Sequence, residues 1–368
     1  MTVLTTKKNY GDTNFLTGMR AIAILLVFLI HSGGGGLRDF GVWGNFLVDC
    51  GKYGVQVFFV ISGYTIFSQF FQEKYSLKKF LLVRVTRLSL PYFPLLIVLF
   101  LYAQAGGTQL TGWATTINGG TIDAVNLLAH LTYLSPYNLR WQNTIIGIEW
   151  TLGIEAFFYV AIGLLINAGW VRARARPMAF FGALAVIVLC LHLVAAKSLS
   201  LDPHFVHWLP FGYSMMFYLG TLAFVVRRHL KAKYPDGSPT ARTFYLGTIA
   251  AVMLVFLAML TTSTFTTLNG RIPEMFFVVA TFGVIVAYRE GSSTGVLGSR
   301  PLLFMGTISF SFYLLHYLVI LFAPNPTNSV PANFLVQLLV SIAVSVVWYE
   351  IFEKRLYLRA KATIKRAA

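Results

Sequence analysis

Two side chains that could do chemistry stand out in the first apolar segment, residues 14–31. They are Arg20 and His31. At about 100° and 1.5 Å per residue, an α-helix would place both on one face, roughly 16 Å apart along its axis. Imidazole titrates near neutral pH and can act as a general base. A guanidinium inside a membrane helix costs on the order of 2.5–3.5 kcal/mol, so Arg20 is expected to face a cavity or a partner.

A second pair of cations, Arg84 and Arg87, precedes an apolar stretch at residues 88–105. Residues three apart lie on one face of a helix. If a helix begins near residue 88, its free N–H groups and its dipole would add to these two guanidinium groups in attracting a phosphate. The pattern therefore predicts an anion site, although an ordinary positively charged loop has the same composition.

A carboxylate and an indole, Glu155 and Trp150, occur in a later apolar stretch at residues 145–167. A buried carboxylate there could orient His31 and stabilise its charged form, or it could form a structural ion pair with a neighbouring helix. Glu149 lies six residues before Glu155, about 120° away around a helix. No two-carboxylate pair is expected from these two residues.

Other polar groups lie within apolar segments, where they either bond across helices or support a site. They are Ser62, Tyr313 and His316. The other five histidines follow no metal-ligand spacing, so no metal ion is expected. A run of four glycines, residues 33–36, is predicted to end the first helix just after His31.

The amino-acid composition of the chain indicates which kind of secondary structure holds these residues in place. Of the 368 residues, 57% are hydrophobic and only 11% are charged, whereas soluble domains carry about 25% charge. The mean hydropathy is +0.69. We therefore predict an all-α integral membrane protein with about ten spans of bilayer length, at residues 14–31, 53–71, 88–105, 145–167, 178–196, 207–226, 243–262, 273–288, 302–323 and 333–353.

The net charge of +16 reflects topology rather than nucleic-acid binding. With ten spans, 23 of the 29 Lys and Arg residues fall in segments on the side of the N-terminus and five on the other side, while Arg20 lies within the membrane. The positive-inside rule then predicts that both termini are cytoplasmic. The basic side could also attract anionic membrane lipid. We expect a cytoplasmic tail at 1–13, one membrane domain at 14–355 and a basic cytoplasmic tail at 356–368.

Five segments in order resemble acyltransferase family 3, whose members are bacterial membrane proteins that acylate sugars and other envelope acceptors. The segments are residues 16–31, 53–63, 84–91, 150–155 and 308–316. Two positions depart from the family pattern. Thr151 replaces the usual serine, and Ala156 replaces a second acidic residue, which argues against a two-carboxylate role at this segment.

The resemblance implies an O-acyltransferase, most simply an O-acetyltransferase, in the bacterial inner membrane. Its donor would be acyl-CoA, with the phosphates at Arg84 and Arg87. Its acceptor would be a hydroxyl of an envelope polysaccharide or a lipid-linked sugar. His31 would act as general base, with Arg20 and Glu155 beside it. Direct transfer and an acyl-enzyme intermediate both fit.

Two other functions remain open from the sequence. Charged residues inside a helical bundle also mark the substrate paths of transporters, so a flippase for a glycan precursor or an acyl group is the alternative. A noncatalytic membrane subunit of polysaccharide machinery is a third. The sequence contains no visible pair of related halves, which weighs against a transporter.

Overall fold

The computed structural model describes residues 13–72, 76–107, 122–175, 209–261, 271–289, 296–323 and 326–367, together with isolated residues between 176 and 208. Throughout these ranges the regular structure is helical and no strand occurs. Five helices are long and apolar enough to cross a membrane, or six if a bent pair counts as one span. The prediction of an all-α membrane protein is confirmed at this level.

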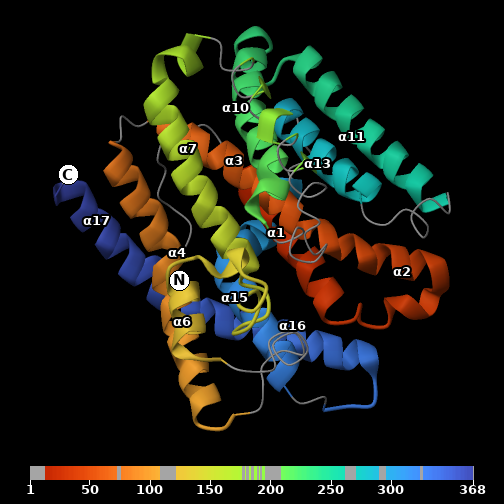
Figure 1. Ribbon diagram of the computed structural model, residues 1–368. Helices are drawn as coiled ribbons and strands as arrows, with labels where there is room; N and C mark the ends of the chain where they lie inside the picture. The colour runs from red at the N-terminus through yellow and green to blue at the C-terminus, as the bar shows by residue number, and fades with distance from the viewer. Residues whose placement is uncertain are drawn as a thin grey trace.

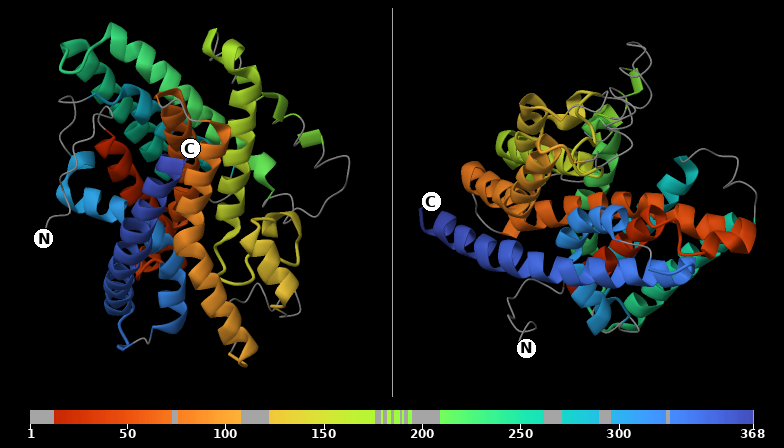
Figure 2. Two further views of the ribbon diagram at one scale, coloured as in Figure 1. Left: turned by 90° about the vertical axis from the view of Figure 1, so that its left-hand side faces the viewer. Right: turned by 90° about the horizontal axis from the view of Figure 1, so that it is seen from below.

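Two helices, α1 (Asn14–His31) and α3 (Gly54–Gln72), run through the middle of the molecule (Figures 1 and 2). Helix α10 (Ser214–Lys233) packs against α3. Their backbones touch, because a Cβ added at Gly63 would lie 2.0 Å from the Phe217 carbonyl oxygen and one at Gly220 would lie 2.0 Å from that of Val60. Small residues permit this kind of approach between membrane helices.

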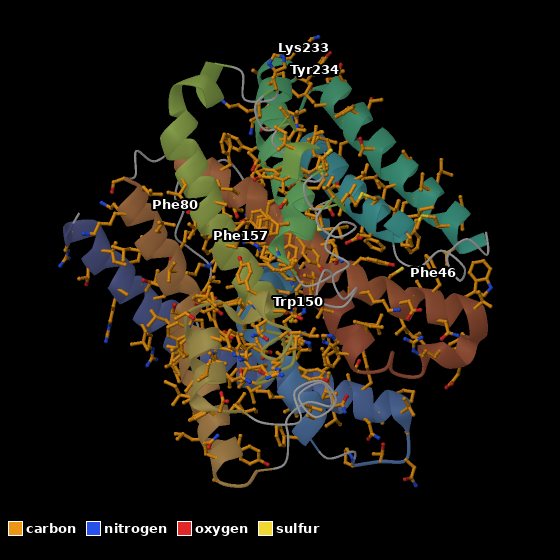
Figure 3. The ribbon with its side chains drawn as sticks, viewed as in Figure 1. Phe46, Phe80, Trp150, Phe157, Lys233 and Tyr234 are labelled. Atoms are coloured by element: carbon orange, nitrogen blue, oxygen red, sulfur yellow. The ribbon has the colours of Figure 1, made fainter. Side chains whose placement is uncertain are left out.

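The remaining long helices surround this centre. One side is formed by α11 (Pro239–Thr261) and α13 (Arg271–Ala287), and the other by α4 (Leu77–Gln104) and α7 (Trp150–Ala175) (Figure 1). Trp150 begins α7 near the middle of the molecule, whereas Lys233 lies at its edge, where α10 ends (Figure 3). Shorter helices complete the fold, namely α2 (Gly41–Asp49) and α6 (Ala124–Leu131).

The predicted ninth span is a broken helix. Helices α14 (Arg300–Thr307) and α15 (Ser309–Phe322) meet at an angle of 73°. Beyond the break, the Ser311 N–H donates to Glu353 Oε1 at 3.0 Å, so a carboxylate from a neighbouring helix caps the first turn of α15. This capping satisfies a backbone donor that the helix itself leaves free.

The last span and the predicted basic tail form one rod. Helix α16 (Val330–Trp348) continues through a π-helical segment (Tyr349–Leu356) into α17 (Tyr357–Ala367). Both views in Figure 2 show this rod as a continuous helix, and α17 packs against α4. The predicted boundary at residue 356 therefore falls inside a helix.

Helix α4 differs most from its predicted span. It begins at Leu77, eleven residues earlier than predicted, where the Ser76 side chain accepts a hydrogen bond from the Lys79 N–H at 3.3 Å. Arg84 and Arg87 therefore lie well inside the helix, and the prediction that they flank its N-terminus is wrong. The predicted tail up to residue 12 and most of the predicted span 178–196 lie outside the described residues.

Candidate active site

A cavity lies between helices α1, α3, α4, α7 and α15. It encloses about 710 Å³ of empty space, part of which is open to solvent. Phe58, Phe59 and Phe310 contribute apolar surface. Each of the five helices contributes polar side chains to its walls, and these comprise three cations, one carboxylate and several hydroxyl groups. They are Arg20, Ser62, Thr65, Arg84, Arg87, Thr151, Glu155, Tyr159, Ser309 and Tyr313.

Glu155 is held at the cavity wall by two hydroxyl groups. Ser62 Oγ donates to Glu155 Oε1 at 3.1 Å, and Tyr159 Oη donates to the same oxygen at 2.6 Å. Neither bond involves His31, so the prediction that Glu155 orients His31 is wrong. The structure instead brings Glu155 and Arg20 to the same cavity.

The three arginines of the cavity differ in what holds them. Arg84 is only 3% exposed, and its Nη2 donates to Gln69 Oε1 at 2.8 Å and to the Thr65 carbonyl at 3.2 Å. In the described part of the chain, neither Arg20 nor Arg87 has a hydrogen bond or an ion pair within 4.0 Å. Arg84 therefore joins α4 to α3, while Arg20 and Arg87 are available to a ligand.

His31 pairs with His316, 285 residues away. His31 Nδ1 lies 2.8 Å from His316 Nε2, and the two rings stack with centroids 5.2 Å apart. His316 Nδ1 lies 3.0 Å and 2.9 Å from the carbonyl oxygens of Phe312 and Tyr313. Carbonyls only accept hydrogen bonds, so Nδ1 of His316 carries a proton. In the neutral pair Nε2 of His316 then accepts from His31 Nδ1–H, which assigns a free lone pair to His31 Nε2.

Tyr313 connects this pair to the cavity. Its hydroxyl accepts from Thr151 Oγ1 at 2.8 Å and donates to the Ile148 carbonyl, while its own carbonyl accepts from His316. Tyr313 also lines the cavity. The position of His316 is thus tied to the start of α7.

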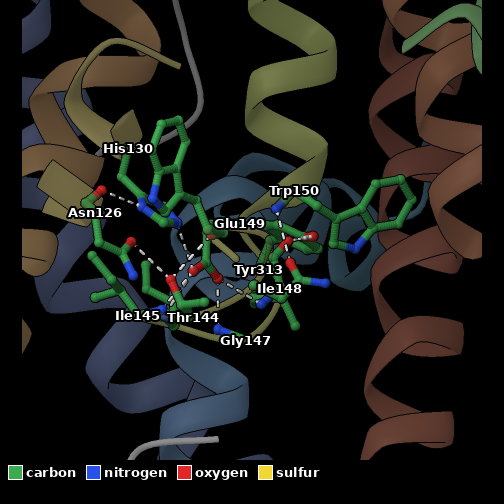
Figure 4. Close-up of polar contacts among 12 residues, drawn as sticks. Asn126, His130, Thr144, Ile145, Gly147, Ile148, Glu149, Trp150 and Tyr313 are labelled. Carbon is green, nitrogen blue, oxygen red and sulfur yellow. Dashed lines mark hydrogen bonds and ion pairs between the residues drawn. The ribbon is translucent and has the colours of Figure 1, made fainter. Parts of the chain in front are cut away.

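The loop before α7 is built around Glu149, which is 1% exposed (Figure 4). Its two carboxylate oxygens accept four backbone N–H groups at 2.5–3.1 Å, those of residues 145–148. His130 Nδ1 lies 2.9 Å from the Asn126 carbonyl and must donate to it, and Nε2 lies 3.2 Å from Glu149 Oε1. The two ring nitrogens of His130 therefore connect α6 to the loop that carries Glu149.

The Glu149 pKa follows from these contacts. Burial by itself raises the pKa, but His130 and the backbone N–H groups outweigh burial and bring the pKa below its ordinary value. The carboxylate therefore stays ionised and fixes the Ile148 carbonyl that accepts from Tyr313.

Comparison with known proteins identifies the family. A family model described as an acyltransferase domain, that of acyltransferase family 3, matches residues 13–350. The chain belongs to acyltransferase family 3. It is also 23% identical over 365 residues to "Putative peptidoglycan O-acetyltransferase YrhL" of Bacillus subtilis (strain 168), a match that covers 92% of this chain. The chain spans about half, 54%, of the length of that curated relative. No solved structure matches.

In this member of acyltransferase family 3, the sequence did not single out Tyr159, which lines the cavity, or Glu353, which contacts a helix that borders it. Tyr159 bonds Glu155 from one turn further along α7, and the i,i+4 spacing could have indicated it. Glu353 caps α15 through Ser311, a contact between residues 42 apart. Near Glu353, Lys354 Nζ lies 2.6 Å from Glu350 Oε1, an ion pair with i,i+4 spacing on the same helix.

Proposed function

We propose that this protein transfers an acetyl group from acetyl-CoA to a hydroxyl of an envelope polysaccharide or a lipid-linked sugar. Membership of acyltransferase family 3 supports acyl transfer, and the name of the Bacillus relative supports a glycan acceptor. Two observations carry the proposal together: Arg20 and Arg87 line the cavity without a partner among the described residues, and the histidine pair has a free nitrogen that suits a general base.

The donor would bind with its phosphates near Arg87 and Arg20. Guanidinium groups form charge-assisted hydrogen bonds with phosphate oxygens. Arg20 and His31 lie on one face of α1, roughly 16 Å apart along its axis. An extended pantetheine arm is of comparable length, so a thioester could reach the His31 end of α1 while the phosphates stay with the arginines.

His31 would remove the proton of the acceptor hydroxyl through Nε2. The ring is already oriented by its Nδ1–H bond to His316, whose own Nδ1–H is fixed by two backbone carbonyls. When His31 takes the proton it becomes an imidazolium, and the bond to His316 is retained. A positioned base of this kind contributes about 10²–10⁴-fold to a rate.

We further propose ten spans in the bacterial inner membrane with both termini cytoplasmic. The distribution of Lys and Arg supports this orientation. The arginines would then receive the donor from the cytoplasm, and His31 would lie toward the outer face, where an envelope glycan is available. Membrane lipid would surround the apolar exterior.

The proposal is tested by measuring transfer of a labelled acetyl group to glycan. Membranes containing the protein are incubated with acetyl-labelled acetyl-CoA and isolated envelope glycan, and the glycan is analysed by mass. We expect base-labile acetyl esters on the glycan with the wild-type protein and none with membranes lacking it. Label that crosses the membrane without attaching to glycan would contradict acyl transfer and favour a transporter.

A further inference from the structure

The glycine run that follows His31 has a backbone conformation that ordinary residues rarely adopt. Gly33, Gly34, Gly35 and Gly36 have φ values of 74°, 89°, 59° and 92°. At Gly33 an added Cβ would meet nothing within 4 Å, so packing does not explain the glycine there. The backbone conformation itself is what requires glycine, and the space beside Gly33 remains open.

Three of the four N–H groups of this run have no hydrogen-bond partner among the described residues. The Gly33 N–H donates to the Ile30 carbonyl at 3.3 Å, and the Leu37 N–H donates to the Gly34 carbonyl at 3.0 Å. Between them, the N–H groups of Gly34, Gly35 and Gly36 have no hydrogen-bond partner among the residues that the structure describes. Gly34 is buried and the next two are half-buried. Buried N–H groups without a partner are rare and call for a ligand or water.

Acyl transfer at His31 requires hydrogen-bond donors close to the carbonyl oxygen of the thioester. As the acceptor oxygen bonds to the thioester carbon, the carbonyl electron pair moves onto its oxygen, which becomes an anion. Arg20 lies roughly 16 Å away along α1 and cannot reach that oxygen. Gly34 lies three residues after His31, so their Cα atoms are at most about 11 Å apart.

We infer that the backbone N–H groups of Gly34, Gly35 and Gly36 form the oxyanion hole for acyl transfer at His31. This inference rests on the proposed function. In the step, His31 Nε2 takes the hydroxyl proton while the new C–O bond forms and the glycine amides bind the oxyanion. The oxyanion then collapses, the C–S bond breaks, and the leaving thiolate takes the proton from His31. The products are the acetyl ester and CoA with a free thiol.

Replacing one amide by an ester tests this directly, because it removes the N–H and adds no side chain. Cys50 permits native ligation of a synthetic segment 1–49 to the remaining chain. The segment carries glycolic acid in place of Gly34, Gly35 or Gly36. We expect at least one ester to lower kcat by about 10²–10³-fold, with the KM for acetyl-CoA within about threefold of wild type. The control is an ester at Gly41, whose N–H bonds the Arg38 carbonyl.

Two recombinant variants form a matched pair for the same question. Gly33 and Gly41 both have positive φ, 74° and 66°, and open space at Cβ, so alanine would be strained at both positions without a packing clash at either. We expect Gly33→Ala to lower kcat at least tenfold, since it displaces the amides that follow, and Gly41→Ala to leave kcat within about twofold of wild type.

The Tyr317 hydroxyl is the alternative hydrogen-bond donor for the oxyanion, because the Tyr317 ring contacts His31 edge-on with ring centroids 5.3 Å apart. We expect Tyr317→Phe to change kcat less than tenfold. Full activity in all three ester variants, or a loss on Tyr317→Phe that exceeds theirs, would overturn the inference. A semisynthetic wild-type chain that moves no acetyl group would contradict the proposed function as well, so the two failures are distinguishable.

Discussion

The three arginines around the cavity have different roles. Arg84 donates hydrogen bonds to acceptors on α3, whereas Arg20 and Arg87, which also line the cavity, have no hydrogen bond or ion pair to the described residues. A cation that is bound by protein cannot also neutralise a phosphate, so the structure assigns Arg84 mainly to stability. The sequence could not distinguish Arg84 from Arg87, because both lie on one face of α4 and the partners of Arg84 come from a different helix.

Arg87→Gln is expected to weaken donor binding. Losing a hydrogen bond to a charged group costs about 1.5–3 kcal/mol, which corresponds to a rise of roughly 10–150-fold in the KM for acetyl-CoA. Initial rates at varied acetyl-CoA provide the measurement, and the exposed Arg242→Gln is the control. Arg84→Gln should instead lower the melting temperature. An unchanged KM in Arg87→Gln would refute the donor site.

Glu149→Gln is expected to unfold more easily, because the amide has one acceptor oxygen where the carboxylate has two, and each buried N–H group left without a partner costs about 1–3 kcal/mol. The folded-state pKa of Glu149 lies below its ordinary value of 4.5. Its contribution to stability is therefore complete above about pH 4.5 and is lost as the pH falls through the folded pKa. Thermal melts between pH 3 and 7 should show less acid destabilisation in Glu149→Gln than in wild type.

Glu350→Gln is the matched control for that experiment. Its carboxylate pairs with Lys354, and these two side chains are about one-third exposed. Exposed pairs contribute about 0–1 kcal/mol. Equal losses of melting temperature in the Glu149 and Glu350 variants would mean that the buried pair does not hold the loop.

At the scale of elements, helical periodicity in the sequence predicted the bounds of α1 and the face it presents. Contacts between residues far apart in the sequence could not be predicted. Helix α1 has its predicted bounds, Asn14–His31, so Arg20 and His31 lie on one face as predicted. The start of α4 was missed because four basic residues interrupt its hydropathy, although Ser76 is a good N-cap. The His31–His316 contact could not be predicted, since no local pattern relates residues 285 apart.

The crossing of α3 and α10 provides a test at this scale. Gly220→Ala would place a Cβ 2.0 Å from the Val60 carbonyl oxygen and force the helices apart. We expect about 1–3 kcal/mol of destabilisation and reduced activity, because α3 carries Ser62 at the cavity. Gly247→Ala, on α11 with nothing within 4 Å, is the control and should be neutral or slightly stabilising. Equal melting temperatures for the two variants would contradict the close approach.

For the whole molecule, the length of the last rod constrains how the protein sits in a membrane. Residues 330–367 form consecutive helical segments, and at about 1.5 Å per residue they exceed the roughly 30 Å hydrocarbon core. One end must therefore leave the core. The end that carries α17 is the basic one, which agrees with the proposed cytoplasmic C-terminus.

Cysteine labelling checks this orientation. In a background without Cys50 and Cys190, Arg359→Cys and Asn328→Cys place thiols at exposed positions beyond the two ends of the rod's apolar part. A membrane-impermeant maleimide should label residue 328 in intact cells and residue 359 only in inverted vesicles. The reverse pattern would contradict the proposed topology.

The central claim is that His31 is the general base of acyl transfer. The most direct measurement is kcat for acetyl transfer by purified His31→Ala in lipid, compared with wild type and with the exposed-histidine variant His229→Ala. We expect His31→Ala to fold and bind acetyl-CoA but to lose about 10²–10⁴-fold in kcat, while His229→Ala retains wild-type kcat. A well-folded His31→Ala protein that transfers acetyl groups at the wild-type rate would contradict the account.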